Sequence, residues 1–157
     1  MPLVLVEYLH ILLAFVFVAS TLASNWNVLA ARRAASWAER ASHLELNRRL
    51  ALLFGLPALI GTGILGNLYA AQLGYRMSES RPLQLVTALW LLSLIVSVVF
   101  GVRVSARLAV QARAATGGNG GEPVDWAAGL ARWRVGNAVQ LLLFLILLWF
   151  MVTPWKA

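Results

Sequence analysis

The chain has 157 residues, of which 61% are hydrophobic and only 12% are charged. Soluble domains carry about 25% charged residues, so this composition excludes an ordinary soluble domain and indicates a chain built for lipid. The net charge of +7 comes from basic residues beside the apolar runs, which indicates membrane orientation rather than nucleic-acid binding. Because the chain has no cysteine, disulfides, thiolate metal sites and CxxCH haem attachment are excluded.

Four apolar segments, each long enough to span a bilayer, follow one another along the chain. The predicted helices cover residues 3–31, 50–73, 82–113 and 126–153, and a flexible glycine-rich linker covers residues 116–123. The sequence therefore predicts one all-α domain, a bundle of four transmembrane helices. No lysine or arginine precedes the first apolar run, so we expect a retained helix rather than a cleaved signal peptide.

Two local features refine this plan. Residues 34–47 have apolar side chains at helical spacing and are expected to form a short helix on the inner membrane surface, with Glu39 and His43 paired four residues apart. Pro57 removes one backbone donor from the second span and should kink its inner half.

Lysine and arginine are distributed unequally between the two ends of the predicted bundle. The end of the bundle with the second connection and the C-terminus has only three basic residues, Arg76, Arg81 and Lys156. The first and third connections hold ten arginines, namely Arg32, Arg33, Arg40, Arg48, Arg49, Arg103, Arg107, Arg113, Arg132 and Arg134. The positive-inside rule then predicts a bacterial inner-membrane protein with both termini outside, whose inner arginines could also hold anionic lipid heads.

Aromatic residues are expected to mark the two membrane interfaces. The inner set is Trp26, Trp126 and Trp133, and the outer set is Tyr8, Tyr75, Trp149 and Trp155.

Ionisable groups inside a span need a reason, because burying them in lipid is unfavourable. His10 is the only histidine in an apolar run, and it lies about 10 Å along the first helix at 1.5 Å per residue. Polar groups on the next two helices share that depth. One polar site in the outer half of the bundle is therefore expected, formed by Glu7, His10, Asn67, Gln84 and Thr87.

Several roles are open for His10. A neutral imidazole in a helical bundle is a good axial ligand for haem iron. Proton transfer is a second role, and metal binding with Glu7 as a weak second ligand is a third. The structural alternative is a hydrogen bond to Asn67 or to a backbone carbonyl, which would tie two helices together.

The second helix carries small residues on one face. Ala58, Thr62, Gly66 and Ala70 follow one another at four-residue spacing, with Gly55 and Gly63 nearby. Such a face lets a neighbouring helix approach closely, or leaves clearance for a flat cofactor or a lipid tail. Gly63, Gly66 and Asn67 are accordingly the candidate pocket beside His10.

The order of these features resembles a family of small bacterial four-helix membrane proteins. The resemblance rests on Glu7-Tyr8-Leu9-His10-Ile11, on Asn47-Arg48-Arg49-Leu50 with Pro57, Thr62 and Gly66, and on Arg132-Trp133 and Met151-Val152-Thr153-Pro154. The family includes the HemJ-type protoporphyrinogen oxidases, the membrane domain of CopD-like copper-resistance proteins and uncharacterised relatives.

The HemJ-type resemblance implies b-type haem bound through His10 and oxidation of protoporphyrinogen. Those oxidases carry a functional lysine in the third helix, and this chain has none between Pro82 and Val102. CopD-like proteins are expected to have more histidine or methionine than the three methionines found here. The resemblance is therefore to the uncharacterised branch.

The leading functional hypothesis is a small membrane protein that binds haem b and takes part in redox chemistry, with His10 as axial ligand. The first alternative is a non-catalytic membrane subunit or scaffold that docks a partner subunit or a second copy. The second alternative is a role in transport of a metal or a small solute.

Overall fold

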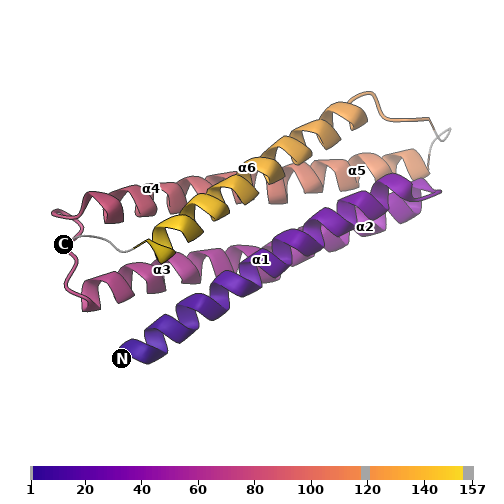
Figure 1. Ribbon diagram of the computed structural model, residues 1–157. Helices are drawn as coiled ribbons and strands as arrows, with labels where there is room; N and C mark the ends of the chain where they lie inside the picture. Colours follow the sequence, from indigo (N-terminus) through magenta and orange to yellow (C-terminus); the bar gives the residue numbers. More distant parts are fainter. Residues whose placement is uncertain (1, 118–120, 154–157) are drawn as a thin grey trace.

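The computed structural model describes residues 2–117 and 121–153, and all regular structure in these ranges is helical. In chain order the elements are α1 (Leu3–Arg33), α2 (Trp37–Leu50), η1 (Ala51–Gly55), α3 (Leu56–Gln72), α4 (Arg81–Val96), η2 (Ser97–Val104), α5 (Ser105–Thr116) and α6 (Trp126–Val152). The π-helical segments η1 and η2 join their neighbours without a break, so the chain forms four long rods (Figure 1). The prediction of an all-α four-helix bundle is confirmed.

All four rods are long and apolar enough to cross a membrane, which makes the chain a multi-pass membrane protein. The second and third rods, Trp37–Gln72 and Arg81–Thr116, have 36 residues each. A helix of that length is about 54 Å long, whereas the hydrocarbon core of a bilayer is about 30 Å thick. The polar segments α2 and α5 account for the excess and extend the bundle beyond the membrane.

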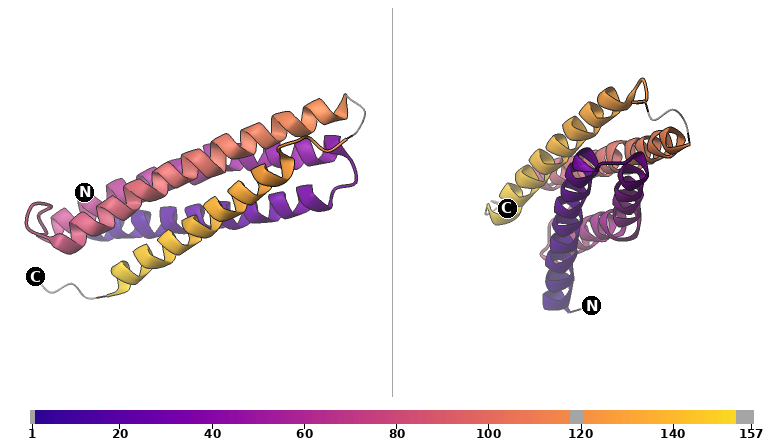
Figure 2. Two further views of the ribbon diagram at one scale, coloured as in Figure 1. Left: turned by 90° about the horizontal axis from the view of Figure 1, so that it is seen from above. Right: turned by 90° about the vertical axis from the view of Figure 1, so that its right-hand side faces the viewer.

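The two ends of the bundle differ in charge and in packing. One end holds the α1–α2 and α5–α6 connections and is called the arginine-rich end, from Arg32, Arg33, Arg113 and Arg132 (Figures 1 and 2). The other end holds the start of α1, the α3–α4 connection and the end of α6, and is called the His10 end. The glycine-rich linker predicted at 116–123 lies at the arginine-rich end, and its residues 118–120 are outside the described residues.

The prediction of a helix lying on the membrane surface at 34–47 is wrong. Ser36 caps α2 by accepting a hydrogen bond from the Glu39 N–H at 3.2 Å, and the helix then continues directly into the second span. Leu44 of α2 and Leu108 of α5 are almost fully buried and belong to the same hydrophobic core cluster. The second rod therefore begins at Trp37 instead of near residue 50, because α2 has a partner in α5. The expected Glu39–His43 pair is confirmed, with 4.0 Å between Oε1 and Nε2.

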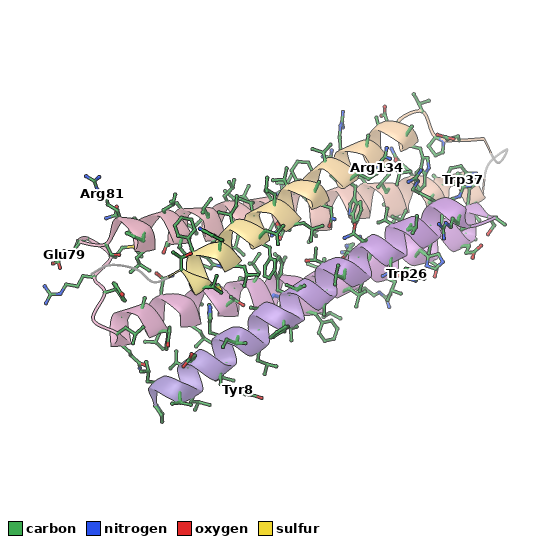
Figure 3. All side chains as sticks on the ribbon, viewed as in Figure 1. Tyr8, Trp26, Trp37, Glu79, Arg81 and Arg134 are labelled. Atoms are coloured by element: carbon green, nitrogen blue, oxygen red, sulfur yellow. The ribbon has the colours of Figure 1, made fainter. Side chains whose placement is uncertain are left out.

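Two of the aromatic predictions are also wrong. Trp126 and Trp133 are each 4% exposed and belong to the core of the arginine-rich end, so they do not face the lipid interface. Trp26 and Tyr8 are 70% and 61% exposed and project outward from α1 near its two ends (Figure 3). Trp155 and Lys156 lie outside the described residues.

Pro57 acts through the π-helical segment η1. A proline clashes with the carbonyl four residues earlier and has no N–H to donate. Just before it, the Leu56 N–H donates to the Ala51 carbonyl, five residues back. This widening accommodates Pro57 without ending the rod, and it places the expected distortion in the half of the span nearer the arginine-rich end.

Candidate functional site

His10 of α1 is held by the backbone of α3. Its Nδ1 lies 2.8 Å from the Thr62 carbonyl oxygen, and the Thr62 hydroxyl donates to the Ala58 carbonyl at 2.8 Å. A carbonyl oxygen only accepts, so Nδ1 carries the hydrogen and Nε2 carries the lone pair. Among the described residues no group forms a hydrogen bond with Nε2. Of the two structural partners expected for His10, the backbone carbonyl is found and Asn67 is not.

Gly66 makes room for the His10 ring. A Cβ at this position would lie 2.8 Å from His10 Cε1, closer than real side chains approach. Five residues earlier, a Cβ at Gly61 would lie 2.5 Å from Leu13 Cδ1. Gly66, which belongs to the predicted small-residue face, and Gly61, which does not, both let α1 and α3 approach closely.

Gly63 serves a different neighbour. A Cβ there would overlap the ring of Trp90, a residue of α4 that sequence reasoning missed. The Trp90 Nε1 donates to the Leu59 carbonyl at 2.8 Å. The Trp90 indole ring therefore packs directly on Gly63.

Asn67 joins α3 to α4. Its Nδ2 donates to the Gly63 carbonyl at 2.9 Å, and its Oδ1 accepts a hydrogen bond from the Thr87 hydroxyl at 3.0 Å. Gln84 does not join this group, because its amide donates to the Met77 carbonyl at 2.8 Å in the exposed α3–α4 connection. The prediction that Gln84 belongs to the site is wrong.

A cavity of about 530 Å³ lies between α1, α3, α4 and the end of α6, and we call it the His10 cavity. Glu7, His10, Asn67 and Thr87 all line it, so four of the five residues expected to share one polar site do so. Its volume falls in the range of small-molecule sites, about 300–1,000 Å³. The remaining wall is mostly apolar, and its aromatic members are Phe17, Tyr69, Tyr75, Trp90, Phe144 and Phe150.

Glu7 stands one turn before His10 on the wall of the cavity. Tyr69 of α3 lies close enough to interact electrostatically with the Glu7 carboxylate, a contact that sequence reasoning also missed. Within residues 2–117 and 121–153, no three histidine, aspartate or glutamate side chains gather as a metal-binding group. Glu7 and His10 therefore do not belong to a group of three such side chains in the described part of the chain.

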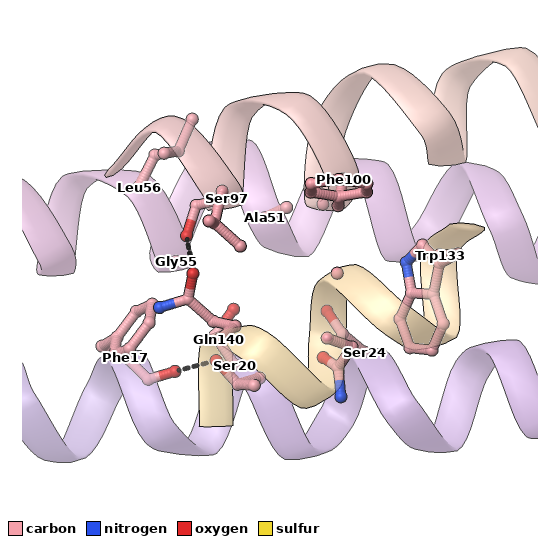
Figure 4. Close-up of a pocket in the computed structure, with 15 residues that line it drawn as sticks. Phe17, Ser20, Ser24, Ala51, Gly55, Leu56, Ser97, Phe100, Trp133 and Gln140 are labelled. Atoms are coloured by element: carbon pink, nitrogen blue, oxygen red, sulfur yellow. Dashed lines mark hydrogen bonds between the residues drawn. The ribbon is translucent and has the colours of Figure 1, made fainter. Parts of the chain in front are cut away.

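A second cavity, of about 50 Å³, lies deeper in the bundle between α1, η1, η2 and α6 (Figure 4). We call it the polar chamber. Its polar lining comes from Ser20, Thr21, Ser24, Ser97, Asn137 and Gln140.

The chamber is organised around the Gln140 amide. Ser97 Oγ donates to Gln140 Oε1 at 3.0 Å, and Gln140 Nε2 donates to Ser93 Oγ. Sequence reasoning missed the chamber, although an amide in the apolar run 135–152 was a signal that a polar partner lay inside the bundle.

Polar side chains near the arginine-rich end fall into two groups. Asn137 Nδ2 donates to Asn25 Oδ1 at 2.8 Å, which joins α6 to α1 inside the bundle. Arg103, Arg132 and Arg134 are exposed instead, and Arg134 projects outward from α6 (Figure 3).

No protein-family model, no curated protein and no solved structure matches this chain. The resemblance to HemJ-type and CopD-like proteins consequently remains an expectation from short motifs.

Proposed function

We propose that this chain is a haem-binding, redox-associated protein of the bacterial inner membrane, in which His10 supplies an axial ligand through Nε2. The observation that carries the proposal is the bond between His10 Nδ1 and the Thr62 carbonyl. A metal-ligating histidine usually has its other ring nitrogen held by a carbonyl or carboxylate, which sets the tautomer and the ring orientation. His10 lines a cavity of about 530 Å³, and the lone pair of its Nε2 is free to bind a ligand there.

The residues around His10 fit a flat apolar group. The cavity wall is mostly apolar and rich in aromatic rings, among them Trp90 and Phe144. Aromatic and apolar side chains around the iron ligand keep water away and tune the potential of a haem. When bound, haem supplies reversible one-electron transfer.

The single intramembrane histidine limits how a haem iron could be coordinated. With only His10 available in the spans, haem b would be five-coordinate, would take a sixth ligand that is not histidine, or would be shared with a partner subunit. Thr62 would orient the ligand, Gly66 would leave it room, and Glu7 would place a carboxyl group at the cavity wall.

The membrane orientation rests on charge. Ten arginines lie in the connections of the arginine-rich end and its flanks, against Arg76 and Arg81 among the described residues at the other end. By the positive-inside rule this supports an inner arginine-rich end, which would contact anionic lipids, and termini on the outer side.

The His10–Thr62 bond also favours a second candidate function. A non-catalytic membrane subunit could use the same bond only to tie α1 to α3, without any ligand on Nε2. A metal-transport role has less support, because the described part of the chain contains no cluster of three potential ligands.

An absorption spectrum separates the two candidates. The protein is purified in mild detergent, supplemented with haem and measured before and after reduction. We expect a Soret band for the wild type and for His43→Asn, which changes the other histidine, a half-buried residue of α2.

His10→Asn is the decisive variant. The Asn amide nitrogen can still donate to the Thr62 carbonyl from the position of Nδ1, but it offers no ligand in place of Nε2. The haem proposal predicts a folded protein without the wild-type Soret band. Haem binding that survives unchanged in His10→Asn would overturn it, as would a wild-type protein that takes up no haem.

A further inference from the structure

The polar chamber is not part of the proposed haem site, yet it lies within the membrane-spanning part of the bundle. Three of its polar side chains, Ser20, Thr21 and Gln140, are more than nine-tenths buried. Polar groups inside a span are unfavourable unless they are paired or wet, so the chamber calls for an explanation.

The depth of the chamber places it near the arginine-rich boundary of the membrane. Ser97 precedes Arg103 by six residues, which is about 9 Å along the helix. Ser24 lies at the same end of the chamber as Trp133, whereas Phe17 lies at the opposite end (Figure 4).

The chamber has hydrogen-bonding capacity that its own residues do not use. Among the described residues, no protein group pairs with the Ser24 hydroxyl or with Asn137 Oδ1. Ser20 Oγ has only a long contact, 3.4 Å, to the Leu50 carbonyl. A water needs about 10–15 Å³ of such space and two to four polar partners. The volume of about 50 Å³ therefore has room for about three waters.

Phe17 separates the chamber from the His10 cavity. It lines both spaces and is 6% exposed. Its ring centroid lies 6.4 Å from that of Phe144, which also lines the His10 cavity. Phe17 is the one residue that the linings of the two spaces share.

We propose that the polar chamber is a hydrated pocket, through which water and protons from the arginine-rich end come within one side chain, Phe17, of the His10 cavity. The two π-helical segments contribute to its walls, η1 through Gly55 and η2 through Ser97 and Phe100. Such segments inside α-helices are frequent at functional sites. The proposal is independent of what binds to His10.

Hydroxyl-radical footprinting in lipid nanodiscs tests the hydration. An X-ray pulse makes radicals from bound water, and these radicals oxidise the side chains that touch it. Phe100 lines the chamber only, and Phe15 is 69% exposed on the lipid-facing side of α1. We expect Phe100 to be oxidised several-fold faster than Phe15. Equal rates, or a slower rate at Phe100, would overturn the proposal.

A variant pair assigns the water to the chamber. Gln140→Leu removes the central amide and should bring the oxidation rate of Phe100 down toward that of Phe15. Gln84→Leu changes an exposed amide in the α3–α4 region and should leave the rate unchanged. Unchanged oxidation of Phe100 in Gln140→Leu would contradict the assignment.

Proton leak through proteoliposomes tests the partition. Phe17→Ala opens the wall between the two spaces and should collapse an imposed pH gradient several-fold faster than the wild type. Phe15→Ala shortens a lipid-facing ring and should not. Equal leak from the two variants would refute Phe17 as the partition, and the wild-type footprint stands by itself if Phe17→Ala does not fold.

Discussion

Replacing Gly63 by alanine should destabilise the bundle by displacing Trp90. A Cβ at Gly63 would overlap the indole ring, so the ring has to move away from α3. Its hydrogen bond to the Leu59 carbonyl, 2.8 Å long, is then lost or bent. Gly101→Ala is the matched control, because it also adds one methyl group to a helical rod. A Cβ at Gly101 would meet no heavy atom of a neighbouring element within 4 Å.

The expected size follows from three contributions. Overpacking costs about 1–3 kcal/mol. A lost internal hydrogen bond costs about 1 kcal/mol. The higher helix propensity of alanine offsets up to about 1 kcal/mol. Gly63→Ala should therefore lower the free energy of unfolding by about 2 kcal/mol, whereas Gly101→Ala should leave it unchanged or raise it.

Unfolding in mixed micelles with increasing SDS, followed by circular dichroism, measures the difference. The result that refutes this reasoning is a Gly63→Ala protein whose stability lies within about 0.5 kcal/mol of Gly101→Ala. Such a result would mean that Trp90 can move away from α3 without lowering the free energy of unfolding.

Three further predictions concern the other contacts. Gly66→Ala crowds the His10 ring, so haem-supplemented protein should retain less haem or show a shifted Soret band; an unaltered spectrum and retention would contradict the role of Gly66. A double-mutant cycle on Asn25 and Asn137 should give a coupling of about 0.6 kcal/mol, the average for polar pairs in membranes, and zero coupling would mean that the pair does not join α1 to α6. Ser78→Cys, in a chain without native cysteine, should react with an impermeant thiol reagent from the outer side, and reaction only from the inner side would reverse the proposed topology.

The sequence was sufficient for the number of spans but not for where the second one begins. Apolar runs of this length have few alternatives to a spanning helix. The polar segment α2 is different, because its place depends on a partner distant in the chain. Asn47 is fully buried and donates to Ser105 Oγ at 2.8 Å, and that residue lies 58 positions later. No local pattern predicts such a pairing.

The sequence predicted only part of the candidate site, for a similar reason. Counting 1.5 Å per residue placed Glu7, His10, Asn67 and Thr87 at one level, and all four line one cavity. Gln84 shared the level but turns to its own connection. The direction of a side chain around its helix depends on packing that the sequence does not reveal.

The contacts missed by sequence reasoning involve residues that look ordinary in a membrane helix. Trp90 and Tyr69 suit an apolar span and carry no special signal, yet Trp90 packs on Gly63 and Tyr69 lines the His10 cavity beside Glu7. Ser93 and Ser97 can satisfy themselves within a helix, so only their shared contact with Gln140 identifies the polar chamber.

The central claim is that His10 Nε2 is a haem ligand, and the most direct measurement compares the wild-type spectrum with that of His10→Asn after haem supplementation. The proposal predicts a Soret band that shifts on reduction in the wild type and is lost in a folded His10→Asn protein. A wild type without the band, or a His10→Asn protein that keeps the wild-type spectrum, would contradict it.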